Sequence, residues 1–331
     1  TYLNFMFDGI VVSYLDEGIR AKLGRENFIN KYSMAVKFNP LTKLTTFLGY
    51  TYEIGQNGTV CPMIHYAPIE FLGAIHDKST GSSYKRFMDL KLKIGDIIKV
   101  TYVNDVMPYV NAIDCEQNRN NTNPIVEFPD KCPDCGTRLI LSDSGKTAIC
   151  TNPICPGKIM SKMVNMLQKL NIKGFGESTI KDLNVFSFHD LMKLKESQIL
   201  NILGPVNSQN LIDAKRSIIN GNLTDADLVG ALGFTGIASQ KWKLIFNNIT
   251  LSSLVKMMDS GDNDNALYTL SNIAGIGNLT AQTIINEYPL YRKDLLYIIE
   301  NIHYRDTTTL VNNNGKQIRF TGCRNLQLVQ Q

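Results

Sequence analysis

The sequence predicts a multidomain α+β protein, and three observations support this fold class. Short β-branched and aromatic runs separated by turn residues fill residues 1–118. Apolar residues recur at three- and four-residue intervals over residues 157–303, and two close cysteine pairs lie between these regions. Strand-like and helix-like patterns that occupy separate halves of a chain indicate separate β and α domains. A length of 331 residues is enough for two to four such domains.

The composition is that of a globular protein and excludes a membrane-spanning one. Hydrophobic residues make up 44% and charged residues 19% of the chain. No run approaches the roughly 20 apolar residues that a membrane span requires. The net charge of +4 permits a nucleic-acid partner without requiring one. Seven cysteines in a metal-type pattern fit a reducing compartment, so we expect a cytoplasmic protein with no membrane partner.

The cysteine pairs predict a structural zinc ribbon. Cys132 and Cys135 enclose two residues, fourteen residues follow, and Cys150 and Cys155 enclose four more. Two thiolate pairs on short turns are typical of a tetrahedral Zn²⁺ site, and four thiolates leave no coordination position open for chemistry. The alternative is two disulfides, which the scattered positions of the other cysteines disfavour.

Two strands are predicted near the start of the chain. Residues 8–13 form an acidic turn and a β-branched run, which predicts a buried strand. Residues 31–40 predict a second strand that a proline ends. Lys37 lies between Val36 and Phe38, so on a strand it points away from both. Its ammonium either faces solvent or is aimed into a cleft at a phosphate.

These two strands resemble nucleotidyltransferase motifs IV and V of bacterial NAD⁺-dependent DNA ligases. The resemblance implies that Lys37 contacts the adenylate phosphate and that Asp8 lies near the phosphate and a Mg²⁺ ion. Lys31 stands where the family usually has an arginine close to the nucleotide. Ser13 stands where the family has a second phosphate-binding lysine, and a hydroxyl donates one hydrogen bond without bringing charge.

The nucleophile of that family is absent from this chain. The family uses the lysine of a Lys-x-Asp-Gly motif to attack the α-phosphate of NAD⁺. The Asp-Gly pair here is Asp8-Gly9, and Met6 stands where the lysine would be. We therefore expect the chain to be inactive without a partner chain that carries Lys-x-Asp-Gly. A subunit of a split enzyme, in a bacterial or phage-infected bacterial cell, and a part of one longer ligase both fit the sequence.

Residues 41–118 predict a small closed barrel of about five strands. The pattern alone fits an OB-fold or an SH3-like barrel. The resemblance favours the OB-fold, because residues 55–58, 93–96 and 104–108 match ligase OB-fold signatures. The first signature departs from the family at Gln56, where an arginine is usual.

Two neighbouring cations in this region are candidate DNA contacts. Lys85 and Arg86 are placed to neutralise phosphates of DNA, and a solvated charged surface is the alternative interpretation.

A repeat in the helical region predicts a DNA-binding helix-hairpin-helix domain. Four segments, 172–180, 203–211, 233–238 and 273–281, each pair a glycine-containing turn with a helix start. Glycine allows close backbone approach to a phosphate, and the helix N-terminus offers free N–H groups, so binding is independent of sequence. Ordinary helix-ending glycines are the alternative, and the second copy lacks the first glycine of the pattern. The candidate DNA-binding glycines are Gly174, Gly176, Gly233, Gly236, Gly275 and Gly277.

The expected order of domains follows from these assignments. The chain is expected to contain six segments in this order: the end of a nucleotidyltransferase domain (1–40), an OB-fold (41–118), a linker (119–131), a four-cysteine zinc finger (132–156), an all-α helix-hairpin-helix domain (157–303), and a linker with a truncated BRCT-like start (304–331).

The resemblance implies the C-terminal part or subunit of an NAD⁺-dependent DNA ligase that seals nicks in duplex DNA during replication and repair. The partner chain would supply the adenylated lysine, and Mg²⁺ would offset phosphate charge. The alternative is a non-catalytic, sequence-independent nicked-DNA binding protein derived from the ligase scaffold. Ser13 and Gln56 favour that alternative, whereas Asp8 and Lys37 oppose it.

Overall fold

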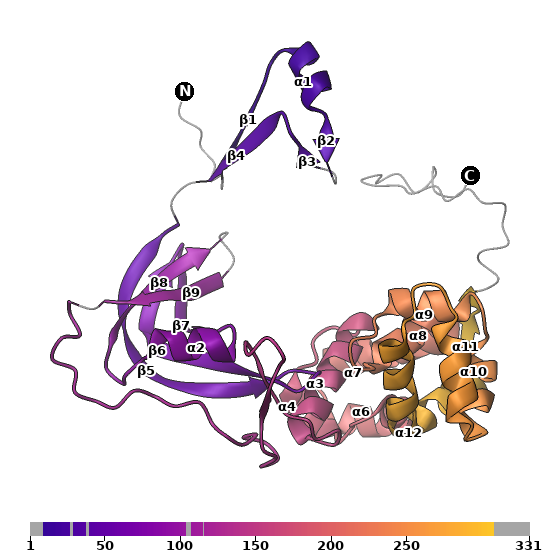
Figure 1. Cartoon of the computed structure of the whole chain (residues 1–331). Helices are drawn as coiled ribbons and strands as arrows, with labels where there is room; N and C mark the ends of the chain where they lie inside the picture. The colour runs from indigo at the N-terminus through magenta and orange to yellow at the C-terminus, as the bar shows by residue number, and fades with distance from the viewer. Residues whose placement is uncertain (1–8, 27–28, 38–39, 104–106, 115, 308–331) are drawn as a thin grey trace. The chain divides into compact units, whose positions relative to one another are not determined.

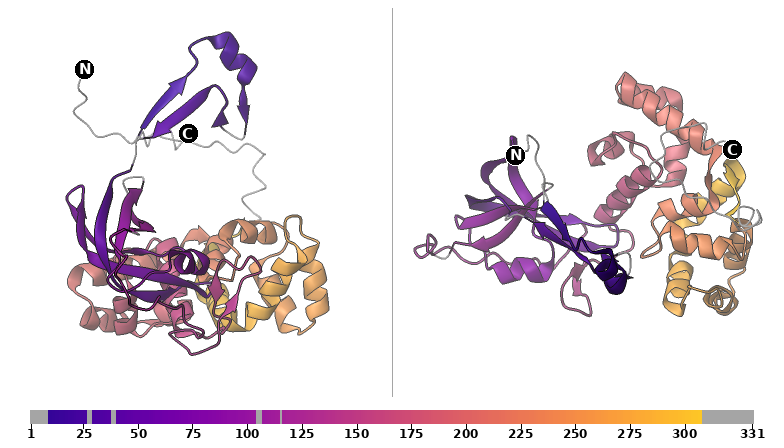
Figure 2. Two further views of the ribbon diagram at one scale, coloured as in Figure 1. Left: turned by 60° about the vertical axis from the view of Figure 1, so that its left-hand side comes forward. Right: turned by 90° about the horizontal axis from the view of Figure 1, so that it is seen from above.

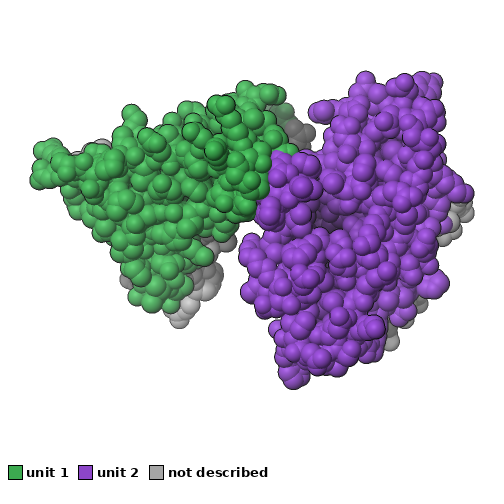
Figure 3. Space-filling view, turned by 90° about the horizontal axis from the view of Figure 1, so that it is seen from below, with its two compact units in different colours: residues 1–53, 59–151 green, residues 54–58, 152–331 purple. Residues whose placement is uncertain are grey.

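The chain folds into two compact units of mixed α and β structure. A computed structural model describes residues 9–26, 29–37, 40–103, 107–114 and 116–307. Residues 1–53 and 59–151 form one unit, here called the sheet unit, and residues 54–58 and 152–331 form the helical unit (Figure 3). Twelve helices and a seven-stranded sheet lie within the described residues, which confirms the mixed α and β character that the sequence predicts.

The first described segment, residues 9–37, is here called the N-terminal lobe (Figure 1). Its strands β1 and β4 pair in antiparallel fashion, and a short helix and a two-residue strand pair lie between them in sequence. The predicted strand after Asp8 is present as β1, but it is not buried, and no described residue of the lobe is buried. The elements are β1 (Gly9–Ser13), α1 (Glu17–Leu23), β2 (Arg25–Glu26), β3 (Ile29–Asn30) and β4 (Ser33–Lys37).

A curved sheet with one covering helix makes up most of the sheet unit (Figures 1 and 2). Its five longer strands are ordered β7-β6-β5-β8-β9, and the pairs β6–β7, β5–β8 and β8–β9 are antiparallel. Side chains of β6 alternate between buried and half-buried from Thr59 to Tyr66, which is the period of a strand with one face on a core. The elements are β5 (Thr42–Ile54), β6 (Thr59–Phe71), β7 (Ala74–Thr80), α2 (Tyr84–Leu90), β8 (Ile97–Val103) and β9 (Met107–Ile113).

The core of the sheet unit is aromatic. Phe47, Phe71 and Phe87 are at most 1% exposed, and they come from two strands and from α2. Ser83 is the N-cap of α2, and its hydroxyl accepts a hydrogen bond from the Arg86 N–H at 3.3 Å. The cysteine-containing segment joins the same sheet, because β11 (Ala148–Ile149) pairs with β6 on one side and with β10 (Ile140–Leu141) on the other.

The helical unit packs ten helices, within its described residues, around one apolar cluster. Trp242 belongs to this cluster and has no exposed surface, and its ring centre lies 5.0 Å from that of Phe234 and 5.5 Å from that of Phe246. The helices are α3 (Pro156–Lys169), α4 (Glu177–Leu183), α5 (Phe188–Lys193), α6 (Glu196–Ile202), α7 (Pro205–Ile219), α8 (Asp225–Leu232), α9 (Ser239–Phe246), α10 (Leu251–Asp259), α11 (Asn263–Ser271) and α12 (Asn278–Asn301).

The sequence predicted an all-α domain over residues 157–303, and this prediction was wrong. The helical unit also contains a pair of strands. Strands β12 (Asn220–Thr224) and β13 (His303–Arg305) pair in parallel, and the Arg305 guanidinium donates to the Asn222 carbonyl at 2.8 Å. Each strand is too short to show an alternating pattern, and the pairing joins residues about eighty positions apart, so local sequence could not reveal it. Strand β13 also places residues 304 and 305, predicted as linker, within this unit.

The structure does not cover the prediction made for the end of the chain. The truncated BRCT-like start, which the sequence places at residues 316–322, falls outside the described residues. Among the helices of the described residues, none has the length and apolar character needed to cross a membrane.

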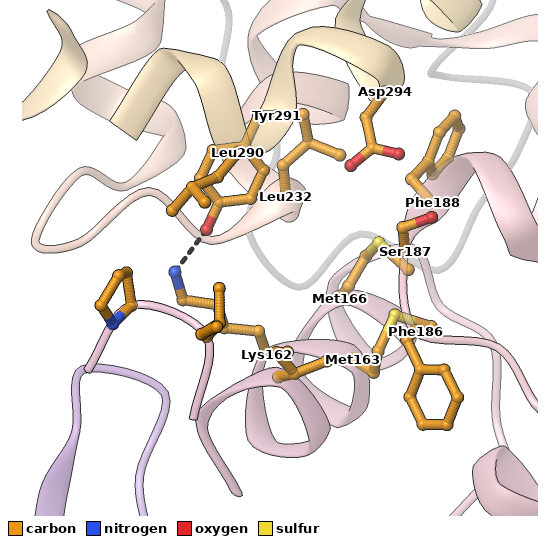
Figure 4. A pocket seen from close by; sticks show the side chains of 13 residues that line it. Lys162, Met163, Met166, Phe186, Ser187, Phe188, Leu232, Leu290, Tyr291 and Asp294 are labelled. Atoms are coloured by element: carbon orange, nitrogen blue, oxygen red, sulfur yellow. Dashed lines mark hydrogen bonds between the residues drawn. The ribbon is translucent and has the colours of Figure 1, made fainter. Parts of the chain in front are cut away.

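One buried carboxylate lies beside a cavity in the helical unit. The cavity has a volume of about 240 Å³, and apolar side chains such as Met163, Met166 and Leu232 form most of its lining (Figure 4). The Asp294 carboxylate lines it at 5% exposure and accepts a hydrogen bond from the His189 N–H at 2.8 Å. Burial, which disfavours the ionised form, raises the pKa of Asp294 to about 6.

We predict that Asp294→Asn stabilises the helical unit at neutral pH. The folded pKa of Asp294 lies above that of the unfolded chain, so folding takes up a proton between about pH 4 and pH 6. Stability therefore falls as pH rises through that window, by an amount on the order of 2–3 kcal/mol. Asparagine can accept the same hydrogen bond from the His189 N–H. Because its side chain does not ionise, it does not lose stability as pH rises.

The measurement is urea unfolding at pH 5 and pH 7.5, followed by fluorescence of Trp242, the chain's one tryptophan. The difference in free energy of unfolding between variant and parent should be larger at pH 7.5. The exposed Asp182→Asn is the matched control and should show no such change. Equal differences at the two pH values would contradict the prediction.

Candidate functional site

Four cysteines form one cluster that fits a metal ion. The Sγ atoms of Cys132, Cys135, Cys150 and Cys155 all lie within 4.8 Å of one another. The Sγ atoms of Cys135 and Cys150 are 3.5 Å apart, well beyond the roughly 2.05 Å of a disulfide bond. A tetrahedron with Zn–S bonds of about 2.3 Å has sulfur–sulfur edges of roughly 3.8 Å. The cluster is thus compatible with the predicted zinc site.

Local backbone geometry presents the four thiols. Gly136 adopts a φ of 72°, and its N–H donates to the Cys132 carbonyl at 2.9 Å, which closes the first knuckle. Cys150 directly follows β11, and Cys155 is the N-cap of α3, with Pro156 at the first helical position. Three of the four thiols are buried and Cys135 is half-buried. The arrangement can hold an ion but offers no open position for a substrate.

Two of the predicted phosphate-binding residues, Lys37 and Ser13, lie on one face of the β1–β4 hairpin. In the β1–β4 register Gly9 is opposite Lys37, Val11 is opposite Ala35 and Ser13 is opposite Ser33. Residues directly opposite share a face, so Lys37 and Ser13 face the same way from opposite ends of the hairpin, about 13 Å apart by strand rise. Lys37 is exposed, and Asp8 lies outside the described residues.

Two of these residues line a shallow hollow. Ser13 and Lys31 lie on the wall of a hollow of about 370 Å³ that Tyr14 and Tyr32 also line. The Lys31 ammonium lies 2.8 Å from a carboxylate oxygen of Glu26, and both side chains are exposed. The structure thus places Ser13 and Lys31 together, and it places Lys37 at the other end of the strand pair.

The two candidate cations on α2 differ in their surroundings. Lys85 is exposed and pairs with Asp89 one turn along the helix, at 3.1 Å. The Arg86 guanidinium donates to the Asn111 carbonyl at 2.7 Å and lies 5.4 Å from the centre of the Tyr109 ring. These contacts fasten α2 to β9, so Arg86 already serves the packing of the sheet unit. Sequence alone cannot show this, because the partners are more than twenty residues away.

Three of the four predicted hairpins share one turn geometry. Gly174, Gly236 and Gly275 have φ between 70° and 87°, and each lies two residues before the N-cap of a helix. The residue between the glycine and the N-cap is buried in each case, and the two flanking residues are exposed. The buried residues are Phe175, Ile237 and Ile276.

The second copy differs, as its sequence suggested. Gly204 has no positive φ, and Val206, at the start of its helix, is 73% exposed rather than anchored in the core. Gly233, a candidate in the third copy, is the C-cap of α8, and its carbonyl accepts a hydrogen bond from the Tyr291 hydroxyl at 2.9 Å.

The hairpin helices also leave their first N–H groups without side-chain caps. None of the N-cap residues Gly176, Ala238 and Gly277 makes a side-chain cap hydrogen bond. Several other helices of the unit are capped by their own hydroxyl or carboxylate, at Ser187, Thr224, Thr250 and Asp262. Uncapped N–H groups remain available to an anion.

Sequence reasoning missed side chains that connect the third and fourth hairpins. The Lys241 ammonium on α9 donates to the Thr280 hydroxyl on α12 at 3.0 Å. A Cβ atom added at Gly275 would lie 2.8 Å from a methyl group of Leu244, so this glycine is also needed for close packing. The Glu287 carboxylate accepts a hydrogen bond from the Thr235 N–H at 2.9 Å, which occupies one donor of the third turn. In the sequence, the glycine that recurs in each hairpin was the one local feature that pointed to these contacts.

Comparison with known proteins gives homologues that share one name. No protein-family model matches the chain. A DNA ligase of a Nitratiruptor species is 30% identical over 224 residues, which cover 65% of this chain and 34% of that protein. A DNA ligase of a Sulfurihydrogenibium species is 25% identical, over 96% of this chain and 45% of that protein. A DNA ligase of Borrelia garinii subsp. bavariensis is 26% identical, over 97% of this chain and 50% of that protein.

The chain therefore has homologues named DNA ligase across nearly all of its length. It spans about a third to a half of the length of these relatives.

We predict that the purified chain binds about one zinc ion and that Cys150→Ser removes it, because a serine hydroxyl is a poor ligand where a buried thiolate is needed. Elemental analysis gives the zinc content, and the free energy of unfolding should fall with it, since metal binding and folding are coupled. Cys61→Ser, outside the cluster, is the matched control. Full zinc content in Cys150→Ser would exclude this residue as a ligand.

Proposed function

We propose that this chain is the C-terminal part or subunit of an NAD⁺-dependent DNA ligase that seals nicks together with a polypeptide carrying the Lys-x-Asp-Gly lysine. One observation carries the proposal: similarity to proteins named DNA ligase extends over 97% of the chain, from the lobe to the helical unit. The order of elements supports it, because the strand order β7-β6-β5-β8-β9 with a helix between β7 and β8 is that of an OB-fold.

The reaction places a specific demand on the N-terminal lobe. AMP passes from NAD⁺ to the lysine of the partner chain, and nicotinamide mononucleotide leaves. The lysine then gives AMP up to the 5′-phosphate of a nick, after which the 3′-hydroxyl attacks that phosphate and AMP leaves. Each step concentrates negative charge on a phosphate, which a fixed cation and Mg²⁺ stabilise. Lys37 supplies the cation, Asp8 organises the phosphate or the metal, and Lys31 and Ser13 approach the nucleotide.

The helical unit supplies a grip on duplex DNA that does not depend on sequence. Three exposed turns each place an uncapped helix N-terminus beside a glycine, so backbone N–H groups can approach phosphate oxygens. Self-capped helices of the same unit lack this property. Lys85, exposed on α2, adds a further contact to phosphate.

The zinc ion has a structural role in this proposal. With four thiolate ligands it has no site for water or substrate, so its chemistry is limited to fixing the ribbon of residues 132–155.

A non-catalytic nicked-DNA binding protein is the second candidate function. The β1–β4 hairpin provides the observation that favours it. Ser13 supplies no charge, and it lies opposite Ser33, about four residues along β4 from Lys37. DNA binding by the helical unit is common to both candidates, so nick sealing separates them.

We predict that Asn278→Pro weakens binding to nicked duplex DNA about tenfold, since a hydrogen bond to a charged phosphate contributes roughly 1.5–3 kcal/mol. Asn278 is exposed at the first position of α12, where proline removes one N–H group and is otherwise tolerated after an extended N-cap. Asn278→Ala changes the same side chain but keeps the N–H, so it is the matched control. Fluorescence anisotropy at fixed salt gives both affinities, and equal affinities would exclude this turn as a contact.

We predict that the chain seals nicks with NAD⁺ and Mg²⁺ when mixed with a ligase N-terminal half from the same genome. Lys37→Ala should reduce the sealing rate on the order of a hundredfold or more while nick binding stays unchanged. Lys22→Ala, an exposed lysine of the same lobe, is the control. Sealing that survives Lys37→Ala would remove Lys37 from the phosphate site. DNA binding without sealing in any mixture would favour the binding protein.

A further inference from the structure

The cavity beside Asp294 has the form of a small-molecule site. Buried apolar side chains, among them Met163 and Met166, make up its inner wall. Phe186, which is 46% exposed, and Leu290, which is 43% exposed, also line it, so the cavity reaches the surface of the helical unit. Pockets with apolar walls and a small number of polar groups are the usual sites of small ligands.

One cation lies in the described part of this apolar lining. The Lys162 ammonium donates to the Tyr291 hydroxyl and lies 5.0 Å from the centre of that ring (Figure 4). Among the described residues, no carboxylate forms an ion pair with it. An ammonium has three N–H donors, so the hydroxyl leaves two of them for a further partner. The cavity thus contains a positive charge whose hydrogen-bond partner in the helical unit is neutral.

The surroundings of Lys162 favour a negatively charged ligand. The side chain is half-buried, and burial lowers the pKa of its ammonium because it removes water from the charge. The Glu287 carboxylate acts in the opposite direction, but it already accepts a hydrogen bond from the Thr235 N–H at 2.9 Å. An anion that reaches the ammonium from the cavity would replace the lost hydration.

The shape of the cavity limits the rest of the ligand. Lining residues recur along α3 at three- and four-residue spacing, so one face of this helix presents the cation together with Met163 and Met166. Figure 4 shows the Asp294 carboxylate on the other side of the space from the Lys162 ammonium, so an anion at Lys162 is kept apart from that like charge. The volume of about 240 Å³ exceeds the roughly 150 Å³ that holds benzene, so it accommodates one ring with a short chain.

We propose that this cavity binds a small apolar acid, such as an aryl or branched alkyl carboxylate. The carboxylate accepts hydrogen bonds from the Lys162 ammonium, and the apolar body packs against Met163 and Met166. The lining shares no residue with the four-cysteine cluster or with the predicted phosphate and DNA contacts. The inference therefore does not rest on the proposed function.

The proposed site lies beside the third hairpin. The Tyr291 hydroxyl that accepts from Lys162 donates in turn to the Gly233 carbonyl at 2.9 Å. Gly233 ends α8, and a Cβ atom added there would lie 3.4 Å from the Cγ atom of Lys162. A bound acid would thus be separated by one side chain from the segment that leads into a candidate DNA-binding turn.

The test is a titration of the full chain with hydrocinnamate, followed by NMR of the methionine methyl groups. The signals of Met163 and Met166 should shift, with a dissociation constant on the order of 1 mM for a ligand of this size. Met258, buried in the same core but outside the lining, is the internal control and should not shift. Hydrocinnamyl alcohol has the same body without the charge and should bind about tenfold more weakly.

Lys162→Met keeps the approximate length of the side chain and removes its charge. The acid should then bind about tenfold more weakly, whereas the alcohol should bind as it does to the parent. Lys169→Met, on the same helix but outside the lining, is the matched control and should change neither affinity. Binding of the alcohol to the Lys162→Met chain would also show that the variant keeps the cavity.

Shifts confined to Met163 and Met166, with a preference for the acid that Lys162→Met removes, would support the proposal. Equal affinities of the acid and the alcohol for the parent would overturn it without any variant. Unchanged affinity of Lys162→Met for the acid would overturn it as well. So would shifts of the same size at Met258, or no shift at ten times the expected dissociation constant.

Discussion

The glycine turns of the helical unit depend on one apolar side chain each. Phe175, Ile237 and Ile276 are buried in the core, while the residues on either side of each are exposed. Without that anchor a glycine-rich turn would sample many conformations, because glycine loses more conformational freedom on folding than other residues. The core around Trp242 thus holds three helix N-termini at the surface with their N–H groups open. Hydrophobic burial here positions backbone groups rather than side chains.

Much of this architecture could be predicted from sequence because the signals are local. The β-branched and aromatic runs of residues 41–118, the cysteine spacing and the repeated glycines each lie within a short window, and each corresponds to observed strands, a cluster or turns. The second hairpin copy lacked a glycine in the sequence and lacks the anchored turn in the structure.

The rest depended on contacts between distant residues. The parallel pair β12–β13, the hydrogen bonds that Arg86 donates to β9, and the carboxylate of Glu287 at the third turn have no local pattern. The burial predicted for β1 was wrong for a different reason. A β-branched run shows that a strand prefers a covered face, but it does not show whether the neighbouring residues of the chain cover it.

The pairing of β12 with β13 has a consequence for how the protein forms during synthesis. Asp225, at the start of α8, is buried, and it accepts hydrogen bonds from the backbone and the hydroxyl of Thr307. A nascent chain therefore cannot complete the helical unit until residue 307 has left the ribosome, by which time the strands of residues 42–113 have long been available to pair. Until then the buried carboxylate of Asp225 lacks both of its hydrogen-bond donors from Thr307. The helical unit thus stays incomplete during the translation of about eighty residues, and an incomplete unit is open to aggregation and proteolysis.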